Sequence, residues 1–161
     1  MAEATRRREQ AWNGSRRPTD SYLPTTATLS MGMWNCRGFS KTKKDILSQC
    51  DFDLTCITET HEWRDTDPLT IYSEPPPKND SWSGVAITVN KRISNAIMDS
   101  NSIGSRIVYC RIRGQSCNIT AVAVYIPQKQ RQNPAQTDTY DQLEKFPMTV
   151  GRRISIILLG D

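Results

Sequence analysis

The sequence predicts an α+β fold, in which several β-strands are combined with short helices. Apolar residues alternate, or follow one another closely, in several short segments that are typical of strands. Two other segments have the apolar spacing of amphipathic helices. The chain has 161 residues and an apolar content of 37%, which is enough for one domain with a hydrophobic core.

The first expected strand covers residues 29–36, which alternate in polarity and end at a tight turn. Ser40 can cap a short helix over residues 41–49. Residues 52–60 follow as a strand that is apolar at nearly every second or third position, so we expect both of its faces to be buried. A strand, a helix and a strand of these lengths predict two neighbouring strands joined by a helical crossover.

The second half of the sequence is expected to be mainly β-structure. Further strands are predicted over residues 84–89, 107–112 and 118–126. Residues 113–116 form a hairpin turn between the last two of them. Residues 137–146 are expected to form an amphipathic helix that Pro147 ends.

The last apolar segment, residues 154–159, is expected to be a strand that leads directly to Gly160 and Asp161. A buried strand normally leads into a turn and further structure, so we interpret the chain as a truncated domain. This domain is expected to occupy residues 29–161. Residues 1–28 have few apolar residues and are expected to be a disordered basic tail.

Composition and charge exclude several classes of protein. No apolar run approaches the roughly 18 residues of a membrane span, and no apolar segment follows the N-terminal arginines as in a signal peptide. The five cysteines are odd in number and lack a C-x-x-C pair, so we expect free thiols, no disulfides and an intracellular location, nuclear or cytoplasmic. The net charge of +4 is too small to indicate a nucleic-acid partner by itself.

Four polar residues stand at or near the ends of predicted apolar strands: Asn35, Glu59, Tyr125 and Asp161. A carboxylate at the end of a buried strand has few waters around it and favours a hard cation such as Mg²⁺. An amide beside it can position a phosphate oxygen or support the carboxylate. Each residue taken alone also has an ordinary structural explanation, so their spacing by itself indicates only a possible hydrolase.

Five segments in a fixed order strengthen this interpretation. They are Met33-Trp34-Asn35-Cys36-Arg37-Gly38, Leu54-Thr55-Cys56-Ile57-Thr58-Glu59-Thr60-His61, Ser83-Gly84-Val85-Ala86-Ile87, Val122-Ala123-Val124-Tyr125-Ile126-Pro127 and Ile156-Ile157-Leu158-Leu159-Gly160-Asp161. Together they resemble the endonuclease/exonuclease/phosphatase superfamily. The most similar branch contains the endonuclease domains of non-LTR retrotransposons and the craniofacial development protein 2-like sequences.

The resemblance implies a two-sheet β-sandwich flanked by helices that cleaves phosphodiester bonds with Mg²⁺ or Mn²⁺. DNA is the expected partner, and no membrane or small-molecule cofactor is expected. Carried over by motif, Asn35 would support the site, Glu59 would be the metal ligand, Tyr125 would contact the scissile phosphate, and Asp161 would orient and deprotonate the attacking water. Arg37 is expected to contact nucleic acid.

The family pattern continues beyond Asp161 with an Asn, a later Asp and an Asp–His pair, none of which this sequence contains. We therefore expect an N-terminal part of the domain, with the C-terminal part missing, that is inactive or nearly so. Two alternatives stay open: a non-catalytic remnant that binds nucleic acid or protein, and a phosphatase of inositol phosphates or other small phosphodiesters. The sequence predicts neither the target site nor the oligomeric state.

Overall fold

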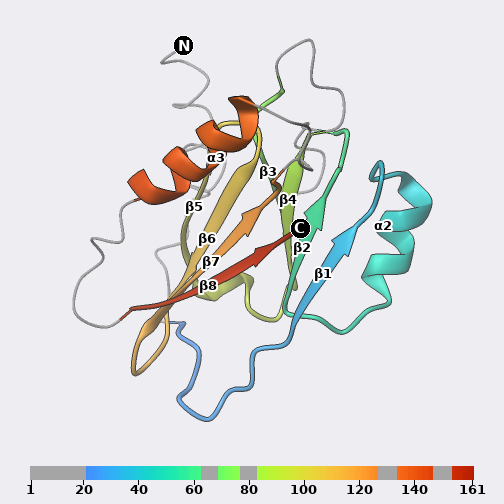
Figure 1. Ribbon diagram of the computed structural model, residues 1–161. Helices are drawn as coiled ribbons and strands as arrows, with labels where there is room; N and C mark the ends of the chain where they lie inside the picture. The colour runs from blue at the N-terminus through green and yellow to red at the C-terminus, as the bar shows by residue number, and fades with distance from the viewer. Residues whose placement is uncertain (1–20, 63–68, 77–82, 127–133, 147–153) are drawn as a thin grey trace, which may run out of the picture.

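The computed structural model of this chain describes residues 21–62, 69–76, 83–126, 134–146 and 154–161. Two four-stranded sheets, with strand orders β1-β2-β4-β3 and β5-β6-β7-β8, pack against each other (Figure 1). Helix α2 lies beside the first sheet and α3 beside the second (Figure 1). The predicted two-sheet sandwich with flanking helices is therefore confirmed.

The first sheet is mixed. Its elements, with the helix that joins the first two strands, are β1 (Met31–Asn35), α2 (Lys41–Ser48), β2 (Leu54–Thr58), β3 (Thr70–Tyr72) and β4 (Val85–Val89). β1 and β2 are parallel, and β4 runs antiparallel to both β2 and β3. This topology confirms the predicted helical crossover, and every residue of β2 is buried, as the sequence predicted.

The second sheet is antiparallel up to its last strand. Its elements are η1 (Ser94–Ala96), β5 (Ile97–Ile103), β6 (Ile107–Ile112), β7 (Asn118–Val124), α3 (Pro134–Lys145) and β8 (Ile154–Gly160). β6 and β7 form the predicted hairpin, and β8 runs parallel to β7. Helix α3 begins three residues earlier than predicted, and Pro147 lies outside the described residues.

Three apolar clusters hold the layers together. The largest lies between the sheets and includes Ile87 of β4 and Val108 of β6. A second cluster joins the outer face of the first sheet to α2, from which Leu47 packs against it. A third joins the outer face of the second sheet to Phe146, whose ring contacts the ring of Tyr109 at a centroid distance of 5.3 Å. Each sheet thus carries packed apolar side chains on both faces, although Ile156 and Leu158 of β8 are 39% and 59% exposed.

Two strands were not predicted, and the predicted cap of α2 makes no capping hydrogen bond. β5 was not predicted because its sequence, IMDSNSI, is polar, and its residues remain partly exposed at the sheet edge. β3 has only three residues and gives too short a pattern to recognise. Ser40 precedes α2, but its side chain makes no capping hydrogen bond.

The predicted tail also differs from the structure in its last part. The N–H of Leu23 donates to the carbonyl of Arg113, and the N–H of Gln115 donates to the carbonyl of Leu23, both at 2.9 Å. Leu23 also packs against the core between the sheets. Residues 21–28 therefore run along the β6–β7 turn, because one apolar side chain and a β-bridge attach them there. Residues 1–20 lie outside the described residues, and there the tail remains a prediction.

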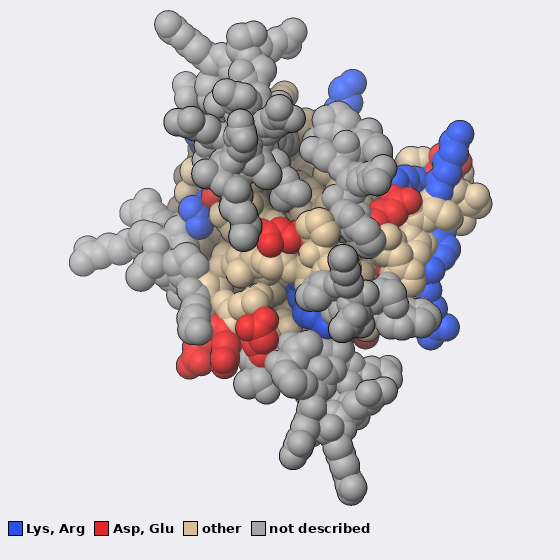
Figure 2. Space-filling model, turned by 90° about the horizontal axis from the view of Figure 1, so that it is seen from above, with Lys and Arg blue, Asp and Glu red and all other residues tan. Residues whose placement is uncertain are grey.

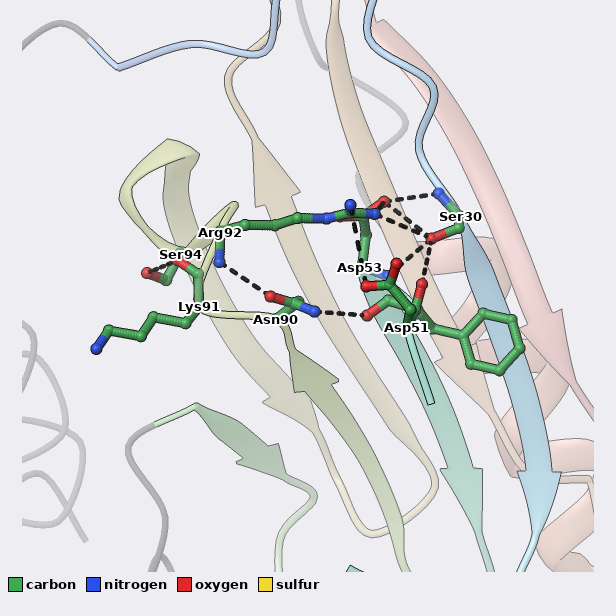
Figure 3. A network of polar contacts seen from close by, with 8 residues as sticks. Ser30, Asp51, Asp53, Asn90, Lys91, Arg92 and Ser94 are labelled. Atoms are coloured by element: carbon green, nitrogen blue, oxygen red, sulfur yellow. Dashed lines mark hydrogen bonds and ion pairs between the residues drawn. The ribbon is translucent and has the colours of Figure 1, made fainter. Parts of the chain in front are cut away.

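A polar network fixes the amino ends of β1 and β2 (Figure 3). The Asp53 carboxylate is buried and accepts hydrogen bonds from Arg92 Nε at 2.5 Å and Nη2 at 2.8 Å, and from the Ser30 N–H at 2.8 Å. Burial opposes the charge on Asp53, but the hydrogen bonds from Arg92 and Ser30 outweigh it and hold the pKa of this carboxyl below its usual value. The network therefore ties the loop before β1, the loop before β2 and the turn after β4 together.

The helices of the described residues are short. Neither of the α-helices in the described part of the chain is long and apolar enough to cross a membrane.

Candidate functional site

The candidate site lies where β1, β2 and β8 end. Because β1 and β2 are parallel, Asn35 at the end of β1 and Glu59 directly after β2 meet at the same edge of the first sheet. Asp161 follows β8 of the other sheet, and the carboxyl end of the chain lies beside β2 (Figure 1). Residues far apart in the sequence therefore meet at one end of the sandwich.

The Asn35 amide connects the two sheets at this point. Its Nδ2 donates to Glu59 Oε1 at 2.9 Å and to Asp161 Oδ2 at 2.6 Å. A carboxamide nitrogen carries two N–H groups, so both of its donors are used. Asn35 Oδ1 is buried and accepts no hydrogen bond from the residues that the structure describes. Three of the four catalytic candidates predicted from the sequence are thus brought into direct contact.

The backbone around Glu59 is unusual. β2 ends at Thr58, two residues earlier than predicted, and Glu59 and His61 both have a φ of 53°. Glu59 and His61 therefore do not continue the strand as alternate residues on one face, because both leave the extended conformation. Left-handed φ values at non-glycine residues cost about 1–3 kcal/mol each and persist only where surrounding contacts enforce them.

Hydrogen bonds from two neighbouring segments enforce this conformation. The N–H of Gly38 donates to the Glu59 carbonyl at 2.6 Å, and the N–H of Phe39 donates to the Thr60 carbonyl at 2.8 Å. On the other side, the Thr60 N–H donates to the Gly84 carbonyl at 3.1 Å. The segment that carries Glu59 is thus held between the turn after β1 and the start of β4.

Gly84 is required for this close approach, and we expect Gly84→Ala to be destabilising. The residue has a φ of +130°, and a Cβ atom there would lie 2.5 Å from Thr60 Oγ1. The free energy of unfolding should fall by about 1–3 kcal/mol in urea titrations. Ser83→Ala is the matched control, because the Ser83 hydroxyl is buried without a hydrogen-bond partner among the described residues and its loss should cost little. Equal losses in the two variants would contradict this account.

Tyr125 and Arg37 lie near site residues, but no contact described for them involves Asn35, Glu59 or the Asp161 side chain. Tyr125 precedes Ile126, which pairs with Asp161, and Arg37 lies two residues after Asn35. The Ile126 N–H donates to the Asp161 carbonyl at 2.9 Å, so the β7–β8 ladder continues past Tyr125. The Tyr125 ring packs against the core, and the Arg106 guanidinium carbon lies 5.6 Å from the ring centre. Arg37 is exposed in the turn after Asn35 and has a φ of 44°. The functional roles predicted for both residues remain predictions.

The donor atoms of the site suit a hard divalent cation. Glu59 and Asp161 each use one carboxylate oxygen for the Asn35 amide, and the buried Asn35 Oδ1 is a further oxygen donor. Within the described ranges no group of three or more His, Cys, Asp or Glu side chains is placed to hold a metal ion. Two carboxylates are nevertheless what Mg²⁺ commonly takes from a protein, with water and phosphate oxygens completing its shell. The residues present therefore fit the implied metal.

The cysteine beside the site is buried, which disfavours its thiolate form. Burial raises the pKa of the Cys36 thiol to about 11, so it stays protonated near neutral pH. Its Sγ lies 3.6 Å from the Glu59 carbonyl oxygen, to which it donates. All five cysteines lie within the described residues and are free. The chemistry of the site therefore rests on its oxygen donors.

Seen from above, the molecule carries acidic side chains amid uncharged surface, while many of its basic side chains lie on the side where α2 runs in Figure 1 (Figure 2). α2 contributes Lys41, Lys43 and Lys44. Lys43 contacts the turn after Asn35, a role that the sequence did not reveal, because a lysine in the first turn of a short helix has the pattern of a solvated helix face.

Comparisons of sequence agree with the resemblance seen in the motifs, although no protein-family model matches the chain. Craniofacial development protein 2 of Bos taurus is 27% identical over 143 residues, which are 81% of this chain and 23% of that protein. The RNA-directed DNA polymerase from mobile element jockey of Drosophila melanogaster is 27% identical over 115 residues, which are 66% of this chain and 13% of that protein. The chain thus spans about a quarter or less of the length of these relatives.

Comparisons of structure agree with the predicted fold. The catalytic domain of APE2 from Xenopus laevis superposes with a TM-score of 0.60 at 21% identity. The endonuclease domain of TRAS1, a telomere-specific non-LTR retrotransposon, superposes with a TM-score of 0.54 at 18% identity. Each match covers 83% of this chain and 58% of the other. This chain therefore has the fold of these two solved domains and covers somewhat more than half of each.

Proposed function

From a chain that has the endonuclease/exonuclease/phosphatase fold and resembles the non-LTR retrotransposon branch of that superfamily, we propose a part in the metal-dependent hydrolysis of phosphodiester bonds in DNA. One observation carries the proposal: a single amide, that of Asn35, donates to carboxylates from both sheets. Two acidic groups held this close together, each with one oxygen that bonds no residue in the described ranges, form a site for a cation and for the phosphate that the cation binds.

The roles that we propose follow the sequence motifs, and the Asn35 contacts support those of Glu59 and Asp161. Glu59 binds the cation, and Asn35 fixes the orientation of both carboxylates through its two N–H donors. Asp161 orients a water molecule and accepts its proton, while Tyr125 contacts the scissile phosphate. Arg37, exposed in the turn after Asn35, contacts the nucleic-acid backbone. A bound Mg²⁺ ion, or Mn²⁺ in its place, would supply positive charge to a phosphate oxygen.

DNA is favoured over other phosphodiesters by the relatives and by the charge near the site. TRAS1 and jockey are both mobile elements, and the TRAS1 structure is that of its endonuclease domain. The turn after β1 brings a basic residue next to Asn35, since Arg37 is exposed there. Exposed Arg and Lys side chains are the usual contacts of DNA phosphates.

The test is nicking of supercoiled plasmid DNA by this chain in Mg²⁺, under single-turnover conditions with protein in excess. Excess protein allows a single round of cleavage to be followed even when the rate is low. We expect nicking to require Mg²⁺ and to fall about 100-fold in Glu59→Gln. Glu62→Gln is the matched control, because Glu62 is three residues away and is paired with Lys44 at 2.8 Å.

Three results would contradict the proposal. Nicking that persists unchanged in EDTA, or in Glu59→Gln, would place the activity elsewhere. Hydrolysis of a soluble inositol phosphate without plasmid nicking would favour a phosphatase. Salt-sensitive DNA binding that survives Glu59→Gln, with no cleavage at any protein concentration, would favour a non-catalytic binding remnant.

A further inference from the structure

The turn after β1 exposes three consecutive carbonyl groups to one side chain. Arg37 and Gly38 both have positive φ values, 44° and 93°, so the chain reverses sharply here. The N–H groups of Cys36, Gly38 and Phe39 donate to the carbonyls of residues 58–60. The donors of this turn are therefore used by the Glu59 segment, and its carbonyl groups need partners from elsewhere.

Lys43 supplies these partners. Its Nζ lies 2.5 Å from the carbonyl oxygen of Cys36, 3.3 Å from that of Arg37 and 3.0 Å from that of Gly38. An ammonium group carries three N–H donors and no acceptor, so one lysine can serve three carbonyls at once. Hydrogen bonds from a charged donor are also stronger than those between neutral groups.

Packing of helix α2 against the first sheet keeps Lys43 near this turn. Lys43 lies in α2, and Leu47, one turn further along, packs against the apolar cluster on the outer face of the first sheet. Cys36 and Phe39, on either side of the turn, belong to the same cluster. Leu47 therefore anchors α2 to the same apolar cluster as the turn, and this contact keeps the ammonium group of Lys43 beside the turn.

We propose that Lys43 is a positioning residue of the candidate site, which fixes Asn35 and Glu59 at once by holding the turn between Cys36 and Gly38. The turn begins directly after Asn35, and its Gly38 N–H holds the Glu59 carbonyl at 2.6 Å. Loss of the ammonium group would release the three carbonyls and, with them, the support for the left-handed conformation of Glu59. This inference rests on the proposed metal site for its functional consequence, but not for its structural one.

The test compares Lys43→Met with Lys41→Met in the full chain. Both variants remove one positive charge from α2, and Lys41 is exposed at the start of the helix. Amide hydrogen exchange by NMR should show protection of Gly38 and Phe39 falling about tenfold in Lys43→Met, while Val122 in the second sheet is unchanged. The Kd for Mn²⁺ should rise about tenfold, since residues that orient metal ligands typically contribute that much. Lys41→Met should change both quantities less than about twofold.

The two readouts separate the inference from the proposed function. If the wild-type chain binds no Mn²⁺, the metal site is wrong, but exchange at Gly38 and Phe39 still decides the role of Lys43. If Mn²⁺ binds and Lys43→Met leaves both affinity and exchange unchanged, the role of Lys43 is wrong and the metal site stands. Equal loss of protection at Gly38, Phe39 and Val122 would show general destabilisation and would also overturn the positioning role.

Discussion

Asp53→Ala is expected to lower the free energy of unfolding by about 2–4 kcal/mol, a large loss for a polar side chain. The carboxylate is 1% exposed and accepts hydrogen bonds from Arg92 and from both the N–H and the hydroxyl of Ser30. Removing it takes this acceptor from the Ser30 N–H and the Arg92 guanidinium at the point where three segments meet (Figure 3). The loss stays below that of a fully buried ion pair because half of the Arg92 side chain is exposed.

Urea unfolding followed by tryptophan fluorescence measures this effect. Asp51→Ala is the matched control, because Asp51 is two residues away, lies 4.0 Å from the same arginine and is 86% exposed in its side chain. An exposed pair of this kind contributes at most about 1 kcal/mol. A similar loss in the two variants would show that burial of Asp53 does not determine the strength of its network.

The same carboxyl gives the stability of the chain a pH dependence. The pKa of Asp53 is lower in the folded chain than its usual value, which is about 3.9 in an unfolded chain. Its contribution is therefore fully present above about pH 4 and is lost as the pH falls through the lower folded pKa. The difference in stability between the wild type and Asp53→Asn should accordingly shrink below about pH 4.

Strands with a strong apolar pattern were predictable from the sequence. Strands that are partly exposed at the edge of a sheet were not. β2 lies in a segment that is apolar at nearly every second or third position, and the burial of all its residues agrees with the central strand that this pattern predicts. β5 contains Asp99, Ser100 and Asn101 and lies at the edge of its sheet, where partial exposure permits polar residues. Leu23 shows the reverse case, in which one apolar residue in a polar segment attaches that segment to the domain.

The candidate site was predictable as a set of residues but not as a geometry. Asn35 and Glu59 follow from strand ends, and the motifs assigned their roles. Asn35 and Asp161 are 126 positions apart, and only the packing of the two sheets brings them together. The left-handed conformation of Glu59 could not be predicted, because no glycine marks it and the contacts that enforce it come from the turn at Gly38 and from Gly84. The proposed positioning role of Lys43 could not be predicted either, because it depends on the carbonyl groups of the same turn.

The second large effect concerns metal affinity. Glu59→Gln and Asp161→Asn should each weaken Mn²⁺ binding about 10–100-fold, because each variant removes one of the two carboxylates that accept hydrogen bonds from the Asn35 amide among the described residues. Both replacements keep the shape of the side chain, so a change in affinity reports the lost charge rather than a lost contact. Glu62→Gln removes a nearby carboxylate that is paired with Lys44 and should leave the affinity unchanged.

Titration of the chain with Mn²⁺, with the free ion measured by electron paramagnetic resonance, tests the central claim most directly. The account predicts one ion bound per chain, with an affinity that falls in Glu59→Gln and in Asp161→Asn and stays constant in Glu62→Gln. Equal affinity in all four proteins, or no binding by the wild type, would contradict the claim that Asn35 joins Glu59 and Asp161 into one metal site.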